Sequence, residues 1–389
     1  MLFKTEDKQT FFAACLMIFF LRMEWGIATS MLPIYVYEVG GSPLEVGLIF
    51  TIFAGISTFA NPLWGAYSDR IGRRKILIIF GMVGLAPIFL IMSFLRNALM
   101  LTLLRGSTAI FVGAIVPSTW ALVSDISPSK VVGKNMGLIN SFMTAGFGVG
   151  PIIGGFIADS FGFSVLWLVV AIICLVGGLI FFFWGKDPKR LKENVKQFHF
   201  FEVLKNRDVL ILSVTFSIFL LGFSFVGPNY NVHLVKNLGL SKTMVGTVFF
   251  IGTVFSALVQ PIVGSASDKF GRKCFFMIGA LSLTLGNVVF ILARNLFLVF
   301  LAWILISFYD IFQFMGSAYI TDFVSQEKKA EALGFFNSAG SITRSLGAAV
   351  GGLVISITSI STVLLVSAVF PIVSIIIIFL CVREKRKAK

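Results

Sequence analysis

Charged residues are scarce in this chain: only 13% of its 389 residues are Asp, Glu, Lys or Arg, whereas 57% are hydrophobic. A soluble protein of this length would carry roughly a quarter charged residues. Apolar runs of about 18 residues or more recur along the whole sequence, and each is long enough to cross a hydrocarbon core about 30 Å thick. The composition excludes a soluble protein and indicates a polytopic membrane protein.

Other absences narrow the fold and the chemistry. The apolar runs do not alternate with polar residues, which excludes barrel strands and leaves helices as the spanning structure. Cysteines are few and show no CxxC spacing, so neither a disulfide framework nor a metal site is expected; they are Cys15, Cys174, Cys274 and Cys381. No Walker A sequence is present, which excludes ATP as the energy source. Nothing resembles a reaction site, so we expect no enzyme activity and no cofactor.

The net charge of +14 does not indicate nucleic acid as a partner, because Lys and Arg form short clusters between apolar runs without a basic stripe of stacking aromatics. These clusters fall in alternate loops, including residues 70–75 and 269–273. The positive-inside rule then places the basic loops and both termini on the cytoplasmic side of the inner membrane.

Charge clusters and turn signals divide the chain into about twelve predicted spans. They cover residues 11–37, 44–67, 75–95, 98–123, 136–158, 163–184, 209–235, 243–266, 273–293, 296–321, 331–356 and 361–381. The predicted domains are a six-helix bundle in 1–184, a cytoplasmic linker in 185–208 and a second six-helix bundle with a basic tail in 209–389. Within the linker, "KRLKENVKQFHFFEVLKN" fits either an amphipathic surface helix or a solvated basic segment.

A short charged phrase occurs once in each half. "GAYSDRIGRRK" begins at Gly65 and "GSASDKFGRKC" begins at Gly264, and the halves also align Asp125 with Asp322. Two parallel repeats of six spans imply a pseudo-two-fold axis along the membrane normal, with a solute path between the halves.

The six-plus-six topology, the basic linker and this phrase resemble the major facilitator superfamily over essentially the full length. Both copies fit that family's loop pattern G-x-x-x-D-(R/K)-x-G-R-(R/K). The resemblance implies a secondary transporter that works by alternating access on a small-molecule substrate in the lipid bilayer, and we expect it to function as a monomer. The expected gating-loop residues are Gly65, Asp69, Arg70, Gly72, Arg73, Arg74, Gly264, Asp268, Gly271, Arg272, Asp125 and Asp322. The alternative for the basic residues is a role as topology anchors alone.

The fifth predicted span carries "GFGVGPIIGGFIAD". Its glycines and proline fill every place of G-x-x-x-G-P-x-x-G-G, and they are Gly146, Gly150, Pro151, Gly154 and Gly155. Proline bends a helix and glycines let another helix approach closely. The string resembles that of the drug:proton antiporter branch, which implies efflux of substrate in exchange for protons.

Charged side chains inside predicted spans are functional candidates, because an ion at mid-bilayer costs at least about 2.5–3.5 kcal/mol. They are Arg22, Glu24, Arg105, Asp310 and Arg344. Glu24 is our first candidate for the proton carrier and Asp310 the second. Arg105 occupies the place of the family's fourth-span arginine, although Thr108 and Ala109 depart from the expected Gln-Gly. The alternative is a set of buried bridges, such as Arg344 with Asp310, that titrate nothing.

Weaker candidates for polar contacts in a substrate cavity are Asn229, Tyr230, His233, Tyr309 and Gln313. The sequence predicts proton-coupled efflux of small amphipathic or lipophilic compounds. An importer or exchanger of an organic anion or other metabolite is the alternative, since three arginines face two acids within the spans. A non-transporting receptor or scaffold on the same fold is a more distant alternative, which would show no solute flux.

Overall fold

The computed structural model describes residues 5–128, 131–187, 206–324 and 329–382, apart from the side chains of Thr5, Glu6, Asp268, Phe314 and Ala330. Every regular element in these ranges is a helix, and eleven helices are long and apolar enough to cross a membrane. They are α1 (Thr5–Glu38), α2 (Pro43–Ile71), α3 (Arg74–Phe94), α4 (Ala98–Ile126), α5 (Val132–Trp184), α7 (Arg207–Lys236), α8 (Lys242–Phe270), α9 (Arg272–Leu292), α10 (Leu296–Ile320), α11 (Lys329–Ile357) and α12 (Ile360–Cys381). This confirms the predicted all-helical membrane fold. The predicted linker helix lies outside the described residues.

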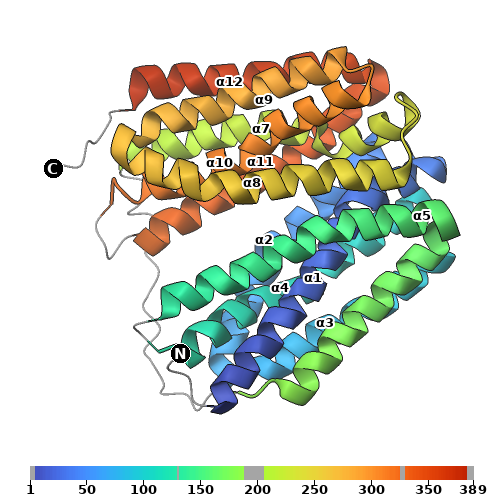
Figure 1. The fold of residues 1–389 in the computed structure, drawn as a ribbon, viewed down its shortest axis with the longest axis vertical. Coiled ribbons are helices and arrows are strands. Elements are labelled where there is room, and N and C mark those ends of the chain that lie inside the picture. The colour runs from blue at the N-terminus through green and yellow to red at the C-terminus, as the bar shows by residue number, and fades with distance from the viewer. Residues whose placement is uncertain (1–4, 129–130, 188–205, 325–328, 383–389) are drawn as a thin grey trace. The chain divides into compact units, whose positions relative to one another are not determined.

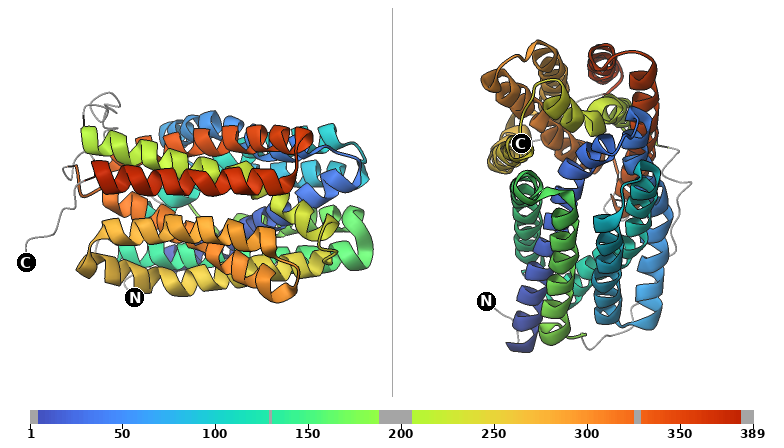
Figure 2. Two further views of the ribbon diagram at one scale, coloured as in Figure 1. Left: turned by 90° about the horizontal axis from the view of Figure 1, so that it is seen from above. Right: turned by 90° about the vertical axis from the view of Figure 1, so that its right-hand side faces the viewer.

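The eleven helices account for all twelve predicted spans, because α5 contains two of them. Its continuity is broken at Gly162, whose φ of 80° and ψ of 171° are not helical. A positive φ of this size favours glycine, which has no Cβ to clash with the backbone. The chain folds back at this point, so that the two arms of α5 form a hairpin (Figures 1 and 2).

The described chain divides into two compact units. Unit 1 contains Met1–Gly41, Ile52–Asn194 and Leu234–Phe250, and unit 2 contains Ser42–Thr51, Val195–His233 and Ile251–Lys389. The first turns of α2 therefore belong to unit 2, and those of α8 belong to unit 1. The predicted division into 1–184 and 209–389 stays a prediction.

The repeated charged phrase forms the connection between two helices in each unit. It joins α2 to α3 and α8 to α9, with a positive φ at Gly72 (66°) and Gly271 (95°). The second glycine of the phrase is therefore needed for the backbone turn. This turn positions the following basic residues at the start of α3 and α9.

Candidate functional site

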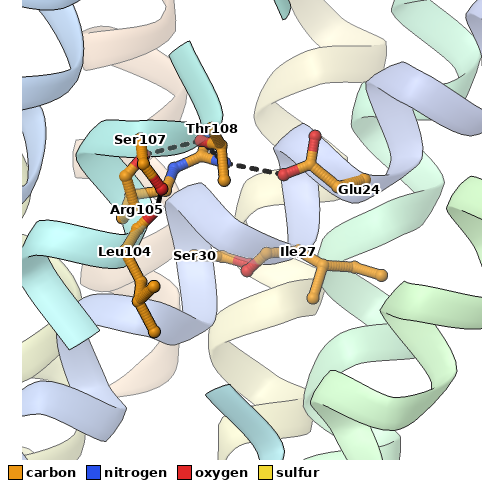
Figure 3. Close-up of polar contacts among 7 residues, drawn as sticks. All are labelled: Glu24, Ile27, Ser30, Leu104, Arg105, Ser107 and Thr108. Atoms are coloured by element: carbon orange, nitrogen blue, oxygen red, sulfur yellow. Dashed lines mark hydrogen bonds and ion pairs between the residues drawn. The ribbon is translucent and has the colours of Figure 1, made fainter. Parts of the chain in front are cut away.

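An ion pair joins α1 and α4 in the interior of unit 1 (Figure 3). Arg105 Nη1 donates to Glu24 Oε1 at 2.7 Å, and the Glu24 side chain has no exposed surface. The other carboxylate oxygen, Oε2, is buried and has no hydrogen-bond partner among the described residues. A buried oxygen without a partner costs about 1–3 kcal/mol. A proton or a polar ligand bound to Oε2 would therefore remove this free-energy cost.

Arg105 has contacts besides Glu24. Its Nη1 also donates to Thr108 Oγ1 at 3.3 Å, and the Thr108 hydroxyl donates to the Arg105 carbonyl at 2.6 Å. The guanidinium lies 4.6 Å from the centre of the Phe53 ring, a distance at which cation–π attraction acts. Thr108 is one of the departures from the family pattern, and here it supports the arginine directly. Arg105 therefore keeps two partners if Glu24 becomes neutral.

Arg22 lies on a different face of α1 from Glu24. Its guanidinium stacks over Trp25 at 4.8 Å, and Trp25 packs edge-on against Phe53 with ring centres 5.2 Å apart. The Nε atom of Arg22 is buried and has no hydrogen-bond partner in the described part of the chain. Two aromatic rings thus connect Arg22 with Arg105, and the buried Nε of Arg22 is a donor without a partner among the described residues.

The glycine string of α5 packs α1 on both sides of Glu24. A Cβ on Gly146 would overlap the Phe19 carbonyl of α1, and one on Gly150 would overlap the Met23 carbonyl. A Cβ on Gly154 would lie 3.0 Å from Ile27. Small residues allow such close backbone approach in membranes. This close packing fixes the position of Glu24 along the axis of α1 relative to α5.

Pro151 completes the α1 contact through the backbone. Proline cannot donate to the carbonyl four residues earlier, so the Phe147 oxygen lacks its helical partner. Gly26 of α1 sits against this oxygen, because a Cβ there would overlap Phe147 O and lie 2.9 Å from Pro151 Cδ. The arrangement permits a Cα–H···O contact between the two helices.

The same string has a second face, which contacts the start of α8 within unit 1. A Cβ on Gly155 would overlap the Lys242 carbonyl, and a Cβ on Gly246 would overlap the Pro151 carbonyl. Asp159, one turn beyond Gly155, accepts from the backbone N–H groups of Lys242 (3.1 Å) and Thr243 (2.8 Å). It therefore caps α8, where a carboxylate is stabilised by the free N–H groups of the first turn.

In unit 1 three of the expected gating-loop residues form an ion-pair cluster. Arg74, the first residue of α3, lies 2.7 Å from Asp125 at the end of α4 and 3.4 Å from Asp69 at the end of α2. Arg74 is buried, so its charge is neutralised by two carboxylates rather than by water. Gly65 does not need to be glycine for packing in this conformation, because a Cβ there would lie 3.8 Å from Pro117.

In unit 2 the corresponding pair uses a different basic residue. Arg272, the first residue of α9, lies 3.2 Å from Asp322, whereas Lys273 donates to carbonyl groups at the end of α12. The sequence repeat aligns Arg74 with Lys273, so the partner is set by which residue begins the helix. The side chain of Asp268 lies outside the described atoms.

Asp310 lies in α10 of unit 2. Its Oδ2 accepts from the Ser256 hydroxyl of α8 at 3.0 Å, and the residue is exposed. Arg344 of α11 donates to the Tyr309 hydroxyl at 3.1 Å, in place of the bridge to Asp310 considered from the sequence. Tyr309 also stacks on Phe223, with ring centres 3.9 Å apart. A carboxylate, a guanidinium and a stacked aromatic pair thus lie together in unit 2.

The weaker cavity candidates are dispersed. Tyr230 is fully buried and its hydroxyl donates to Asn287, which in turn donates to Ser367 at 2.7 Å. Asn229 is buried with no partner for Nδ2 among the described residues. The His233 ring lies 5.4 Å from the Phe290 ring, and Gln313 is half-buried.

The sequence analysis did not identify two polar residues, Ser256 and Asp159, that have partners on other helices. Ser256 is one hydroxyl within an apolar run, and its partner Asp310 is distant in sequence, so no spacing links them. Asp159 ends the glycine string, but its role depends on α8. No group of three or more His, Cys, Asp or Glu side chains that could hold a metal ion occurs in the described ranges.

This helical fold, with the same charged loop in each unit, is that of a membrane transporter family. The model of the Major Facilitator Superfamily matches residues 14–234 and 212–389, and the chain belongs to this family. It is therefore a multi-pass membrane transporter.

Individual relatives are distant. The chain is 27% identical to an uncharacterized MFS-type transporter of Methanocaldococcus jannaschii, covering 91% of this chain and 93% of that one. It is 28% identical to the multidrug resistance protein MdtG of Citrobacter koseri, covering 68% of each chain. Among solved structures, a mutant of the nucleoside transporter NupG superposes with a TM-score of 0.84 at 17% identity, covering 96% of this chain and all of that one. The human organic anion transporter MFSD10 gives 0.68 at 17% identity, again over 96% and 100%.

Proposed function

We propose that this protein is a proton-coupled exporter of small amphipathic or lipophilic compounds in the cytoplasmic membrane, with both termini in the cytoplasm. Two helical bundles would alternate access to a central site, as in duplicated transporters. Glu24 would carry the proton, Arg105 would tune it, and the loop cluster around Asp69 would latch the inner side. The protein would work as a monomer and without enzyme chemistry.

The Glu24–Arg105 ion pair is the observation that carries this proposal. In its ionised form Glu24 neutralises a buried guanidinium, and uptake of a proton removes that attraction. Arg105 then stays in place through Thr108 and Phe53, so protonation changes one contact without unfolding the site. The multidrug resistance proteins among the relatives, together with the complete glycine–proline string on α5, support export over uptake.

An organic anion exchanger is the second candidate. Arginines are present in each unit: the Arg22 Nε atom of unit 1 has no partner among the described residues, and Arg344 of unit 2 bonds to Tyr309. Either arginine could bind a carboxylate through charge-assisted hydrogen bonds. The organic anion transporter among the structural neighbours supports the same choice. An exchanger that binds its anionic substrate through arginines needs no acidic residue that takes up and releases a proton.

Transport by purified protein in lipid vesicles separates the two candidates. A pH gradient is imposed, and the movement of tetraphenylphosphonium, a lipophilic cation, is compared with that of p-aminohippurate, an organic anion. The exporter proposal expects gradient-driven movement of the cation that Glu24→Gln abolishes and the control Asp208→Asn, at the start of α7, leaves intact. Gradient-independent exchange of the anion that survives Glu24→Gln would support the exchanger instead.

A further inference from the structure

A hydrogen-bonded chain connects α10 with α8 in unit 2. Gln260 Nε2 donates to Ser256 Oγ at 3.3 Å, and Ser256 Oγ donates to Asp310 Oδ2 at 3.0 Å. Asp310 lies about ten residues, or about 15 Å, before the end of α10 at Ile320. Ser256 is only 3% exposed, whereas Asp310 is exposed. A carboxyl deep in a spanning helix thus has both an accessible surface and a fixed partner.

The chain leads toward a cavity of about 480 Å³ near the repeated loop, on the expected cytoplasmic side. Gln260 lines this cavity together with Gly264, Ser267 and Arg272. Ser256, Gln260 and Gly264 are four residues apart, so they share one face of α8. Asp310 is therefore bonded to the face of α8 that lines this cavity further along the helix. An intramembrane carboxyl with such polar partners usually serves a function.

Two basic groups face this chain. Arg344 of α11, bonded to Tyr309, attracts the Asp310 carboxylate electrostatically. Arg272 lines the same cavity as Gln260 and pairs with Asp322 at 3.2 Å. Asp310 is thus near a positive charge but is not clamped by a direct ion pair as Glu24 is, so its release of a proton does not require a buried bridge to form.

We propose that Asp310 is a second proton-binding site, and that Ser256 and Gln260 are positioning residues whose hydrogen bonds reverse direction when it takes up a proton. Hydroxyl and amide groups can each donate or accept. With Asp310 ionised, the chain runs from Gln260 to Ser256 to Asp310. When one proton adds to Oδ2, that oxygen donates to Ser256. The Gln260 amide then rotates so that its carbonyl oxygen replaces its NH2 group and accepts from the Ser256 hydroxyl. Both hydrogen bonds of the chain are thus kept in both states.

This inference rests on the proposed proton coupling, but its test does not require a substrate. Infrared difference spectra of the full chain in lipid are recorded across a pH titration, and the C=O band of a protonated carboxyl is followed. Wild type should show a band that Asp310→Asn removes and Glu24→Gln retains. An identical band pattern in wild type and Asp310→Asn would overturn the proposal.

The positioning residues are tested by the position of the same band. Ser256→Ala removes a hydrogen bond to the carboxyl and should shift the band to higher frequency, while Ser256→Thr should restore it. Gln260→Leu should give a smaller shift, because it acts through Ser256. The matched control is Ser265→Ala, an exposed α8 serine whose hydroxyl donates to the Ile262 carbonyl of the same helix. A band unmoved by Ser256→Ala would refute the positioning role. Vesicles with no proton-coupled flux but a normal Asp310 band would instead refute the proposed function.

Discussion

Removing Arg105 tests the ion pair at the centre of unit 1. Arg105→Met leaves the Glu24 carboxyl fully buried without the guanidinium that lies 2.7 Å from it. Breaking a buried pair in this way costs about 3–5 kcal/mol, because it strands a charge, whereas replacing both partners with neutral groups is often close to neutral. The variant also loses the cation–π contact with Phe53, which is worth about 0.5–2 kcal/mol.

A double-mutant cycle separates these effects. We expect Arg105→Met to cost at least about 3 kcal/mol and Glu24→Gln to cost less, since glutamine can still accept from the guanidinium. The double variant should recover at least about 1.5 kcal/mol relative to the sum of the single variants. The cation–π loss is common to both backgrounds and cancels in the cycle.

The free energy of unfolding is measured for all four proteins by reversible denaturation in mixed micelles. Arg294→Ala, which removes an exposed arginine between α9 and α10, serves as the control and should change stability by less than about 0.5 kcal/mol. Additivity of Arg105→Met and Glu24→Gln within about 0.5 kcal/mol would refute a coupled buried pair.

Three further substitutions test the surrounding contacts. Gly150→Ala should abolish transport and lower the folded yield, because its Cβ overlaps the Met23 carbonyl. In the control Gly137→Ala, on the same helix, the new Cβ meets nothing within 4 Å, so this change should be neutral or stabilising by up to about 1 kcal/mol. Equal folded yields of the two variants would contradict the packing argument. Asp159→Ala should remove the cap of α8 and cost about 1 kcal/mol, so hydrogen exchange of the first turn of α8 should rise about fivefold; unchanged exchange would count against the cap. Asp125→Asn should increase exchange at the start of α3 more than Asp69→Asn does, because Arg74 lies 2.7 Å from the first and 3.4 Å from the second; the reverse order would be inconsistent with this cluster.

Most of the fold could be predicted because span length and loop charge are local properties of the sequence. Even the hairpin within α5 was placed correctly, since the predicted spans 136–158 and 163–184 flank Gly162. The sequence also showed that the same charged phrase occurs in a loop of each half. The role of Gly72 and Gly271 in these loops depends on backbone angles, which the spacing of residues does not give.

The contacts of the site could be predicted only in part. The family pattern singled out Arg105, but its direct contact with Glu24 required the structure, because no local spacing relates residues on α1 and α4. The choice of Arg272 rather than Lys273 as the partner of Asp322 depends on where α9 begins. Packing does not explain Gly65 in this conformation, because the neighbouring helix leaves space for a Cβ. Ser256 and Asp159 acquire partners from distant helices, so their roles required the structure.

The exchange of protons for substrate tests the account most directly. Vesicles containing the purified protein and the pH-sensitive dye pyranine are given tetraphenylphosphonium on one side, and the interior pH is followed as the cation moves. The account predicts that protons move opposite to the cation in wild type and that Glu24→Gln uncouples the two fluxes. Cation movement without any proton movement in wild type, or full coupling in Glu24→Gln, would contradict it.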